Sequence, residues 1–116
     1  YASYYQETSN ESSLCVLFQP KKCDILIPGD RGFAAERLLL KDHTLPKLEL
    51  LVAGHHGSNY STSEELLSVT GPEYVFISAG QDNRYGHPAQ QTLERLLQFG
   101  CMIFCTADDG TIIFRR

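Results

Sequence analysis

Long apolar runs, basic clusters and internal repeats are all missing from this 116-residue sequence, and these absences narrow its class. No apolar run approaches the roughly 18 residues that a membrane-spanning helix requires, so we expect a soluble segment. The formal charge is −4, and Lys and Arg are scattered apart from the pairs Lys21-Lys22 and Arg115-Arg116. Because neutralising DNA phosphates requires clustered basic side chains, this distribution argues against a protein that coats DNA. A nuclease stays open, since bound divalent metals would create a local positive site.

The four cysteines do not have the spacing of a disulfide framework or a zinc knuckle. Two of them fall in one strand-like run, Cys-Met-Ile-Phe-Cys, where four residues span about 13 Å, which is beyond disulfide reach. We therefore predict buried thiols that pack as small apolar side chains, at Cys15, Cys23, Cys101 and Cys105.

The length and composition indicate one globular domain spanning residues 1–116. Hydrophobic residues make up 42% of the chain and charged residues 21%, which is the balance of a folded domain with a single core. The segment 1–11 is polar and shows no periodicity, and the chain begins at Tyr1 without an initiator Met. We expect this segment to enter the domain from a longer protein.

Short apolar runs bounded by turn residues alternate with helical patterns, which is typical of an α/β layer. The chain is too short to supply a second layer, so we expect a mixed sheet with helices on one face. Strands are expected over residues 13–18, 23–27, 48–53 and 74–79, helices over 34–40, 63–67 and 88–99, and a final hairpin pairing 102–105 with 111–114 across the turn 108–110.

Metal-binding side chains follow three of these expected strands. Asp30, His55, His56 and His87 all stand in Gly- or Pro-containing turns where strands end, so they are expected to meet at one edge of the sheet. Carboxylate and imidazole are the ligand mixture of zinc hydrolases that keep one position open for water. The alternative for Asp30 alone is a turn or helix-capping aspartate.

A hydroxyl-rich segment follows the histidine pair, at residues 58–63. One interpretation is helix capping, with Ser61, Thr62 or Ser63 as the N-cap. The other is that hydroxyls and helix N-terminal amides hold a phosphate beside the metal. The sequence leaves both open.

His87 stands near the start of the clearest helix, where the helix dipole disfavours the cationic imidazole. We therefore expect a neutral His87 that can ligate a metal or bond to a substrate, and the alternative is a histidine that is simply exposed at the surface. Its neighbours Asn83, Arg84 and Tyr85 are candidates for substrate contact.

These motifs, in this order, resemble the metallo-β-lactamase superfamily, and specifically the C-terminal lactamase-like domain of ComEC-type DNA internalisation competence proteins. The resemblance covers residues 10–114. Three motifs carry it: Gly29-Asp30, His55-His56-Gly57-Ser58 followed by Ser61, and Tyr85-Gly86-His87-Pro88.

The resemblance implies roles for single residues. Asp30 would bridge two metal ions, zinc or manganese, and His55 or His56 would bind the second ion, with a slight preference for His55. His87 and Ser58 would be catalytic residues that steady the phosphate or the leaving group. The segment from Asn10 to Ser13 resembles the family segment that stands where related enzymes place a metal-binding histidine, so Asn10 and Ser13 are candidates for substrate binding. Ser61, Asn83 and Tyr85 are further substrate-binding candidates on the residues themselves.

One departure is decisive for activity. The superfamily's main metal motif, H-x-H-x-D-H, does not occur in this chain, and the family carries it on the preceding half of the domain. The chain therefore resembles the second half of an αββα sandwich. Lacking most ligands of the first metal, it is expected to bind metal poorly and to be inactive by itself.

For the parent protein, the resemblance implies a metal-dependent nuclease that acts on DNA phosphodiesters, on the extracytoplasmic side of a bacterial inner membrane. Its partners would be DNA, the upstream half of the domain and a membrane channel region. Two alternatives stay open: another lactamase-fold hydrolase acting on a phosphodiester or a lactone, and a non-catalytic α/β module that binds a partner or regulates a channel. The sequence upstream of Tyr1 would discriminate among them.

Overall fold

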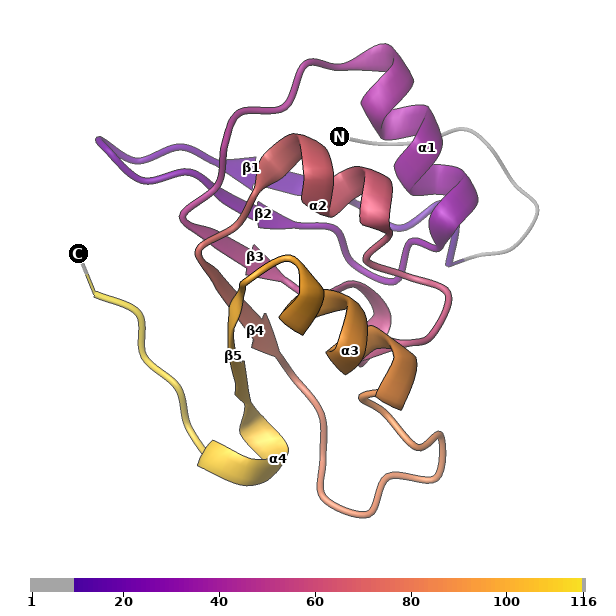
Figure 1. Cartoon of the computed structure of the whole chain (residues 1–116). Coiled ribbons are helices and arrows are strands. Elements are labelled where there is room, and N and C mark those ends of the chain that lie inside the picture. The colour runs from indigo at the N-terminus through magenta and orange to yellow at the C-terminus, as the bar shows by residue number, and fades with distance from the viewer. Residues whose placement is uncertain (1–9, 116) are drawn as a thin grey trace.

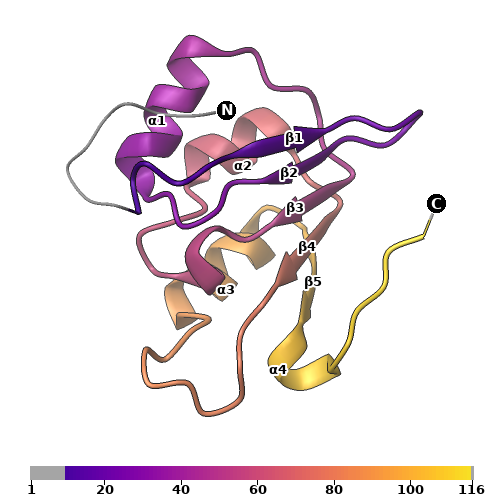
Figure 2. The same cartoon turned by 180° about the vertical axis from the view of Figure 1, so that it is seen from behind.

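The computed structural model describes residues 10–115, which form a five-stranded sheet with its main helices on one face (Figures 1 and 2). The strands lie in chain order, with β1 antiparallel to β2 and the other neighbours parallel. Residues 1–9, most of the expected polar lead-in, and Arg116 lie outside the described residues. The elements are β1 (Val16–Phe18), β2 (Ile25–Ile27), α1 (Phe33–Asp42), β3 (Leu50–Val52), the 3-10 turn η1 (Gly54–Gly57), α2 (Glu64–Thr70), β4 (Tyr74–Ile77), α3 (Gln90–Gln98), β5 (Met102–Cys105) and α4 (Thr106–Asp109).

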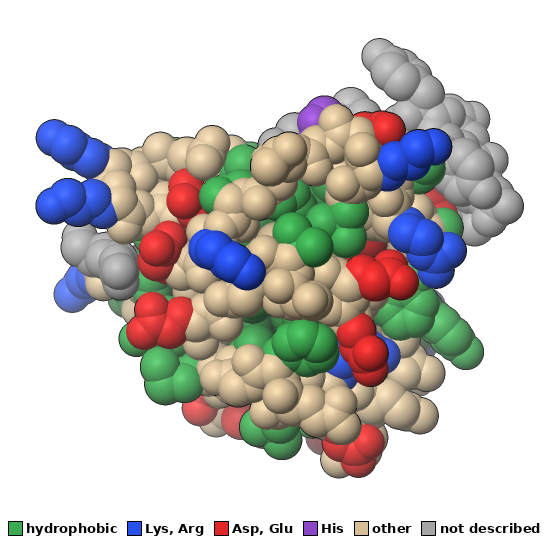
Figure 3. All heavy atoms as spheres, turned by 45° about the horizontal axis from the view of Figure 1, so that its top comes forward, with side chains coloured by type: hydrophobic (Ala, Val, Ile, Leu, Met, Phe, Trp, Pro, Cys, Tyr) green, Lys and Arg blue, Asp and Glu red, His purple; other side chains and the backbone are tan. Residues whose placement is uncertain are grey.

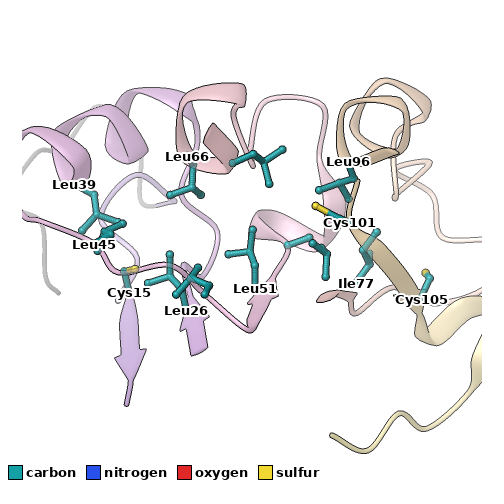
Figure 4. Packing of buried hydrophobic residues seen from close by; sticks show 14 residues of the cluster. Cys15, Leu26, Leu39, Leu45, Leu51, Leu66, Ile77, Leu96, Cys101 and Cys105 are labelled. Carbon is teal, nitrogen blue, oxygen red and sulfur yellow. The ribbon is translucent and has the colours of Figure 1, made fainter. Parts of the chain in front are cut away.

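The core lies between the sheet and helices α1, α2 and α3 (Figure 4). Leu26, Leu51 and Ile77 rise from β2, β3 and β4, while Leu66 and Leu96 descend from α2 and α3. Side chains along a strand point alternately to the two faces of the sheet, so about every second residue of each short strand faces this core. The four cysteines are buried thiols, as the sequence predicted.

The opposite face of the sheet, which we call the open face, is apolar and largely uncovered. The C-terminal segment crosses part of it, since the Phe114 ring lies 5.7 Å from that of Tyr74 and 6.1 Å from that of Phe76. The fold is therefore one α/β half of a sandwich, as expected. Exposed apolar side chains on the open face are Val16, Phe18, Ile27, Met102 and Phe104.

The prediction of a C-terminal hairpin is wrong. Residues 106–109 form the short helix α4, in which the Asp109 carboxylate accepts the Cys105 N–H at 3.0 Å. The strand β5 pairs with β4 in parallel, and residues 111–114 form no strand. Phe114 instead packs over the aromatic side chains of the open face.

Helices α1 and α2 are capped at their N-termini in different ways. Ser63 caps α2, since its Oγ accepts the Leu66 N–H at 3.1 Å, which settles the three N-cap candidates in favour of Ser63. At the start of α1, the Glu11 carboxylate accepts the N–H groups of Gly32 and Ala35 at 3.0 and 2.9 Å. A carboxylate there satisfies otherwise unbonded donors and favours the helix dipole. None of the helices within residues 10–115 has the length and apolar composition needed to cross a bilayer.

Candidate metal and substrate site

The carboxyl ends of β2 and β3 bring Asp30 and His56 together. Asp30 follows β2, and His56 lies in η1, directly after β3. The Asp30 Oδ1 and His56 Nε2 atoms are 3.9 Å apart, and both side chains are about half exposed. The His55 N–H donates to the Gly29 carbonyl at 2.9 Å, which ties the two strand ends to each other. Carboxylate and imidazole therefore do converge at one edge of the sheet.

The histidine pair has an unusual backbone. His55 and His56 have φ angles of 47° and 56°, in the left-handed region that non-glycine residues rarely occupy. This conformation costs roughly 1–2 kcal/mol per residue, so the surrounding structure must hold it. Gly57 follows at φ 78°, and a Cβ there would lie 2.7 Å from the Cβ of Pro88. Only glycine fits at that contact.

The orientation of His56 is fixed by a hydrogen bond to the neighbouring strand end. Its Nδ1 lies 2.7 Å from the Ser78 carbonyl oxygen. Because a carbonyl only accepts, Nδ1 carries the proton and donates it, which leaves the Nε2 lone pair on the side of Asp30. Histidines that ligate metals are held in this way. The geometry thus favours His56 as a ligand over His55, the residue slightly preferred on sequence alone.

His87 lies against the ring of His55, with centroids 5.6 Å apart. Its loop is held by Asn83, whose amide nitrogen donates to the carbonyls of Gly80 and His87 and whose Oδ1 accepts the His87 N–H at 2.9 Å. Burial lowers the pKa of His87, and electrostatic interaction with the nearby His55 and His56 lowers it further. Neutral His87 is therefore favoured, as expected, although the chief cause is burial.

Tyr85 projects from the same loop and is 68% exposed. Its ring stacks on His87, with centroids 5.8 Å apart and planes inclined by 26°. The Arg84 guanidinium lies 4.8 Å from the centre of the Tyr85 ring and donates to the phenol oxygen at 2.6 Å. A cavity of about 440 Å³ opens beside these residues, and its lining includes His56, Ser78, Asn83, Tyr85, His87 and Thr106.

Ser58 and Ser61 are buried and engaged with the protein itself. The Ser58 Oγ accepts the Tyr60 N–H at 3.3 Å, and its carbonyl accepts the Thr92 hydroxyl at 2.8 Å. The Ser61 hydroxyl donates to the Arg31 carbonyl at 2.7 Å. These contacts support the structural interpretation of the hydroxyl-rich loop, and direct contact of Ser58 or Ser61 with a substrate stays a prediction.

Two charged residues that sequence reasoning missed hold this loop. Glu36 is fully buried, and its carboxylate accepts the N–H groups of Thr62 and Ser63 at 2.5 and 2.9 Å. The Arg95 guanidinium donates to the carbonyls of Ser61 and Thr62 at 3.1 and 3.0 Å. We call Glu36 and Arg95 the loop clamp. Its weak signal in the sequence is that Glu36 interrupts the apolar side of its helix.

Thr62 links the clamped loop to the histidine turn. It is fully buried, has a φ of 58°, and its hydroxyl oxygen accepts the Gly54 N–H at 3.0 Å. A β-branched residue with positive φ is a genuine outlier that the structure must enforce. The conformation of the histidine pair therefore depends on the loop that follows it.

The Asn10 to Ser13 stretch lies beside the turn that carries Asp30. The Ser13 N–H donates to the Asn10 carbonyl at 3.0 Å, and the Arg31 Nε donates to the Ser13 carbonyl at 2.9 Å. A Cβ on Gly29 would approach the Ser13 Cβ to 3.1 Å. The predicted substrate-binding residues Asn10 and Ser13 are thus neighbours of the Asp30 turn, and their contact with substrate stays a prediction.

Asp30 and His56 fit a divalent metal but supply only part of its coordination. Tetrahedral zinc places two donor atoms about 3.3 Å apart, so the observed separation of 3.9 Å needs only a small side-chain movement. Within residues 10–115, no group of three or more His, Cys, Asp or Glu side chains is arranged to hold a metal ion. The donors fit zinc or manganese if further ligands come from elsewhere.

The helix-bearing side shows no dominance of one charge. Acidic and basic side chains are interspersed across the view in Figure 3. This distribution agrees with the net charge of −4. Within residues 10–115, this side of the molecule therefore has no broad basic surface through which it could bind DNA.

Comparison with known proteins gives three relatives, one of them named for recombination and one for competence. The chain is 33% identical over 108 residues to ComE operon protein 3 of Bacillus subtilis, covering 93% of this chain and 14% of that protein. It is 35% identical over 103 residues to Recombination protein 2 of Haemophilus influenzae, covering 89% and 13%. It is 38% identical over 66 residues to Competence protein ComA of Neisseria gonorrhoeae, covering 57% and 10%. The chain thus spans about one seventh of the first two relatives. No protein-family model and no solved structure matches it.

Proposed function

This chain belongs to the ComEC-type family of competence proteins, and on that premise we propose that it is half of a metal-dependent nuclease domain acting on DNA during uptake. The observation that carries the proposal is the pair Asp30 and His56, 3.9 Å apart, with the His56 ring oriented by Ser78. A divalent metal bound there would lower the pKa of a water molecule and offset charge on a phosphodiester.

Within this proposal, the residues of the site have defined tasks. The Asp30 carboxylate and the His56 Nε2 would hold the divalent metal. Neutral His87 at the rim donates a hydrogen bond to the phosphate or to the leaving group, since its pKa is lowered by burial and by the neighbouring histidines. The loop clamp holds the histidine turn in its strained backbone conformation.

The rest of the coordination would come from the preceding part of the parent protein. The open face supports this, because a broad apolar surface on a sheet normally packs against another layer. The chain covers only 14% of ComE operon protein 3, which leaves ample chain for such a layer and for a membrane channel. We place the domain on the extracytoplasmic side, with DNA as its substrate.

The test uses the chain joined to its own upstream half. We expect cleavage of DNA that depends on manganese or zinc, and metal bound in a defined ratio by elemental analysis. Asp30→Ala and His56→Ala should lower metal affinity at least about tenfold and abolish cleavage. His55→Ala should retain more metal than His56→Ala, and Asp42→Ala, at an exposed site on α1, should behave as wild type.

A completed domain that is inert on DNA with every metal tried, and whose metal content is unchanged by Asp30→Ala, would contradict the proposal. The chain would then be better described as a non-catalytic α/β module.

A further inference from the structure

We propose that the cavity beside His56 takes a nucleobase of single-stranded DNA, with Tyr85 as the stacking surface; this inference rests on the proposed function. The cavity measures about 440 Å³, within the range of small-molecule sites. It extends from the candidate metal ligand His56 to the loop that carries Tyr85 and His87. A strand whose phosphate lies at the Asp30 and His56 pair would therefore place a neighbouring base at this cavity.

Tyr85 is an exposed aromatic residue. A large aromatic ring that is 68% exposed gains little from packing within the chain. One of its faces is stacked on His87, which fixes the ring without burying it. Arg84 braces the same ring through a cation–π contact and a hydrogen bond to the phenol oxygen. The ring is thus held in place and accessible.

The aromatic and imidazole rings form a continuous series toward the candidate metal ligands. Tyr85 stacks on His87, His87 meets the edge of His55 at 5.6 Å, and His55 meets the edge of His56 at 6.3 Å. His56 in turn lies beside Asp30. Aromatic surfaces therefore line the approach to the proposed reaction centre, as in proteins that bind single strands by base stacking.

Several polar groups that line the cavity are already bonded within the protein: Asn83 bonds the backbone of its own loop, the Ser78 carbonyl accepts from His56, and the Thr106 hydroxyl both donates to and accepts from the Ala79 backbone. The His56 Nε2 and the His87 imidazole, which also face the cavity, have their tasks at the metal and the phosphate in the proposed function. Ring faces therefore remain for a base. The cavity should therefore hold a base by stacking and discriminate little among the four bases.

The experiment measures binding in EDTA, so that it does not depend on metal or cleavage. Fluorescence anisotropy at low salt would compare a labelled hexathymidylate, an abasic strand of equal length and a hexamer duplex. Loss of a stacked base costs about 1–3 kcal/mol, so Tyr85→Ala should weaken hexathymidylate binding by between about fivefold and about 150-fold. Tyr85→Phe, which keeps the ring, should stay within about twofold of wild type.

Tyr60→Ala is the matched control, because Tyr60 is 70% exposed but lies outside this cavity. It should bind hexathymidylate as wild type does. The abasic strand should bind wild type as weakly as hexathymidylate binds Tyr85→Ala, and Tyr85→Ala should cause no further loss with it. The duplex should bind more weakly than the single strand, because its bases are already stacked.

Equal binding of hexathymidylate by wild type and Tyr85→Ala, or equal binding of the abasic and thymidine strands by wild type, would overturn the inference. These outcomes are separable from failure of the proposed function. Base-dependent binding without cleavage in the completed domain would retain the stacking site and reject the nuclease. Cleavage that ignores Tyr85 would retain the nuclease and reject the stacking site.

Discussion

Replacing Glu36 by glutamine tests whether the loop clamp holds the candidate site together. The two Glu36 carboxylate oxygens accept the N–H groups of Thr62 and Ser63, and the side chain is fully buried. Glutamine keeps one accepting oxygen but turns an NH2 group toward the other N–H. That backbone donor then has no acceptor and no access to water.

The expected loss follows from that single unsatisfied donor. A buried unsatisfied donor costs about 1–3 kcal/mol, so Glu36→Gln should lower the free energy of unfolding by about 2 kcal/mol. Glu36→Ala loses both acceptors and leaves a cavity, which should cost about 3–5 kcal/mol. At roughly 4 °C per kcal/mol for a chain of this size, the Tm should fall by about 8 °C for the glutamine variant.

The pH dependence has a defined sign. Burial raises the pKa of Glu36, although hydrogen bonds from Ser63 and Thr62 and the charge of Arg95 oppose the increase. The folded chain therefore holds this proton more tightly than the unfolded chain. Its contribution to stability is full below the ordinary glutamate pKa of about 4.3 and declines as the pH rises through the folded pKa. The glutamine variant lacks this decline. The difference in the free energy of unfolding between wild type and Glu36→Gln, the stability gap, should therefore narrow as the pH rises.

Urea unfolding followed by far-UV circular dichroism, at several pH values, measures these differences. Glu65→Gln is the matched control, because Glu65 pairs with Arg37 at 3.6 Å on the surface with both side chains mostly exposed. It should change stability by less than about 0.5 kcal/mol. If Glu36→Gln is as mild as this control, or if the gap widens with rising pH, the account of the loop clamp is wrong.

Three further predictions concern the same region and the core. Thr62→Val removes the acceptor of the Gly54 N–H, and urea unfolding should show a loss of about 1–3 kcal/mol. Gly57→Ala brings a Cβ within 2.7 Å of Pro88 at a φ of 78°; the loss of stability should exceed about 2 kcal/mol, and NMR spectra should show shifted signals from the loop carrying Pro88. The four cysteines should react slowly with a thiol reagent in the folded chain and yield four thiols per chain in denaturant without reductant.

Each of these predictions has a comparison that can contradict it. Thr62→Ser keeps the hydroxyl and should lose less than Thr62→Val, whereas an equal or larger loss in Thr62→Ser would contradict the assignment of the effect to the hydroxyl. Gly71→Ala also meets a positive φ, 46°, but its Cβ would lie no closer than 3.7 Å to another atom, so it should cost less than Gly57→Ala. Fewer than four thiols in denaturant would indicate a disulfide.

The sequence was sufficient to predict the parts of the fold that depend on the order of the strands. Parallel strands present their carboxyl ends at one edge, so Asp30 and the histidine pair could be placed together from apolar runs and turns alone. The choice between His55 and His56 could not be made, because it depends on two left-handed backbone residues and on the Ser78 carbonyl, which arrives from another strand.

The contacts of the loop clamp and of the C-terminal segment could not be predicted from the sequence, for a different reason. Glu36 and Arg95 bond backbone groups about 26 and 34 positions away, and backbone partners leave no signature in side-chain chemistry. Residues 111–114 form a short apolar run such as a strand would have, yet Phe114 packs across the open face. A short apolar run does not show which surface its side chains pack against.

The open face divides the sheet into positions with different mutational behaviour. Polar substitutions at helix-facing positions such as Leu51 or Val75 should unfold the chain in any context. Polar substitutions at outward positions such as Phe18 or Met102 should be nearly silent in the isolated chain and become harmful only within the full-length protein. A mutational scan performed in both contexts would therefore reveal a covering layer as a pattern of alternate residues along each strand.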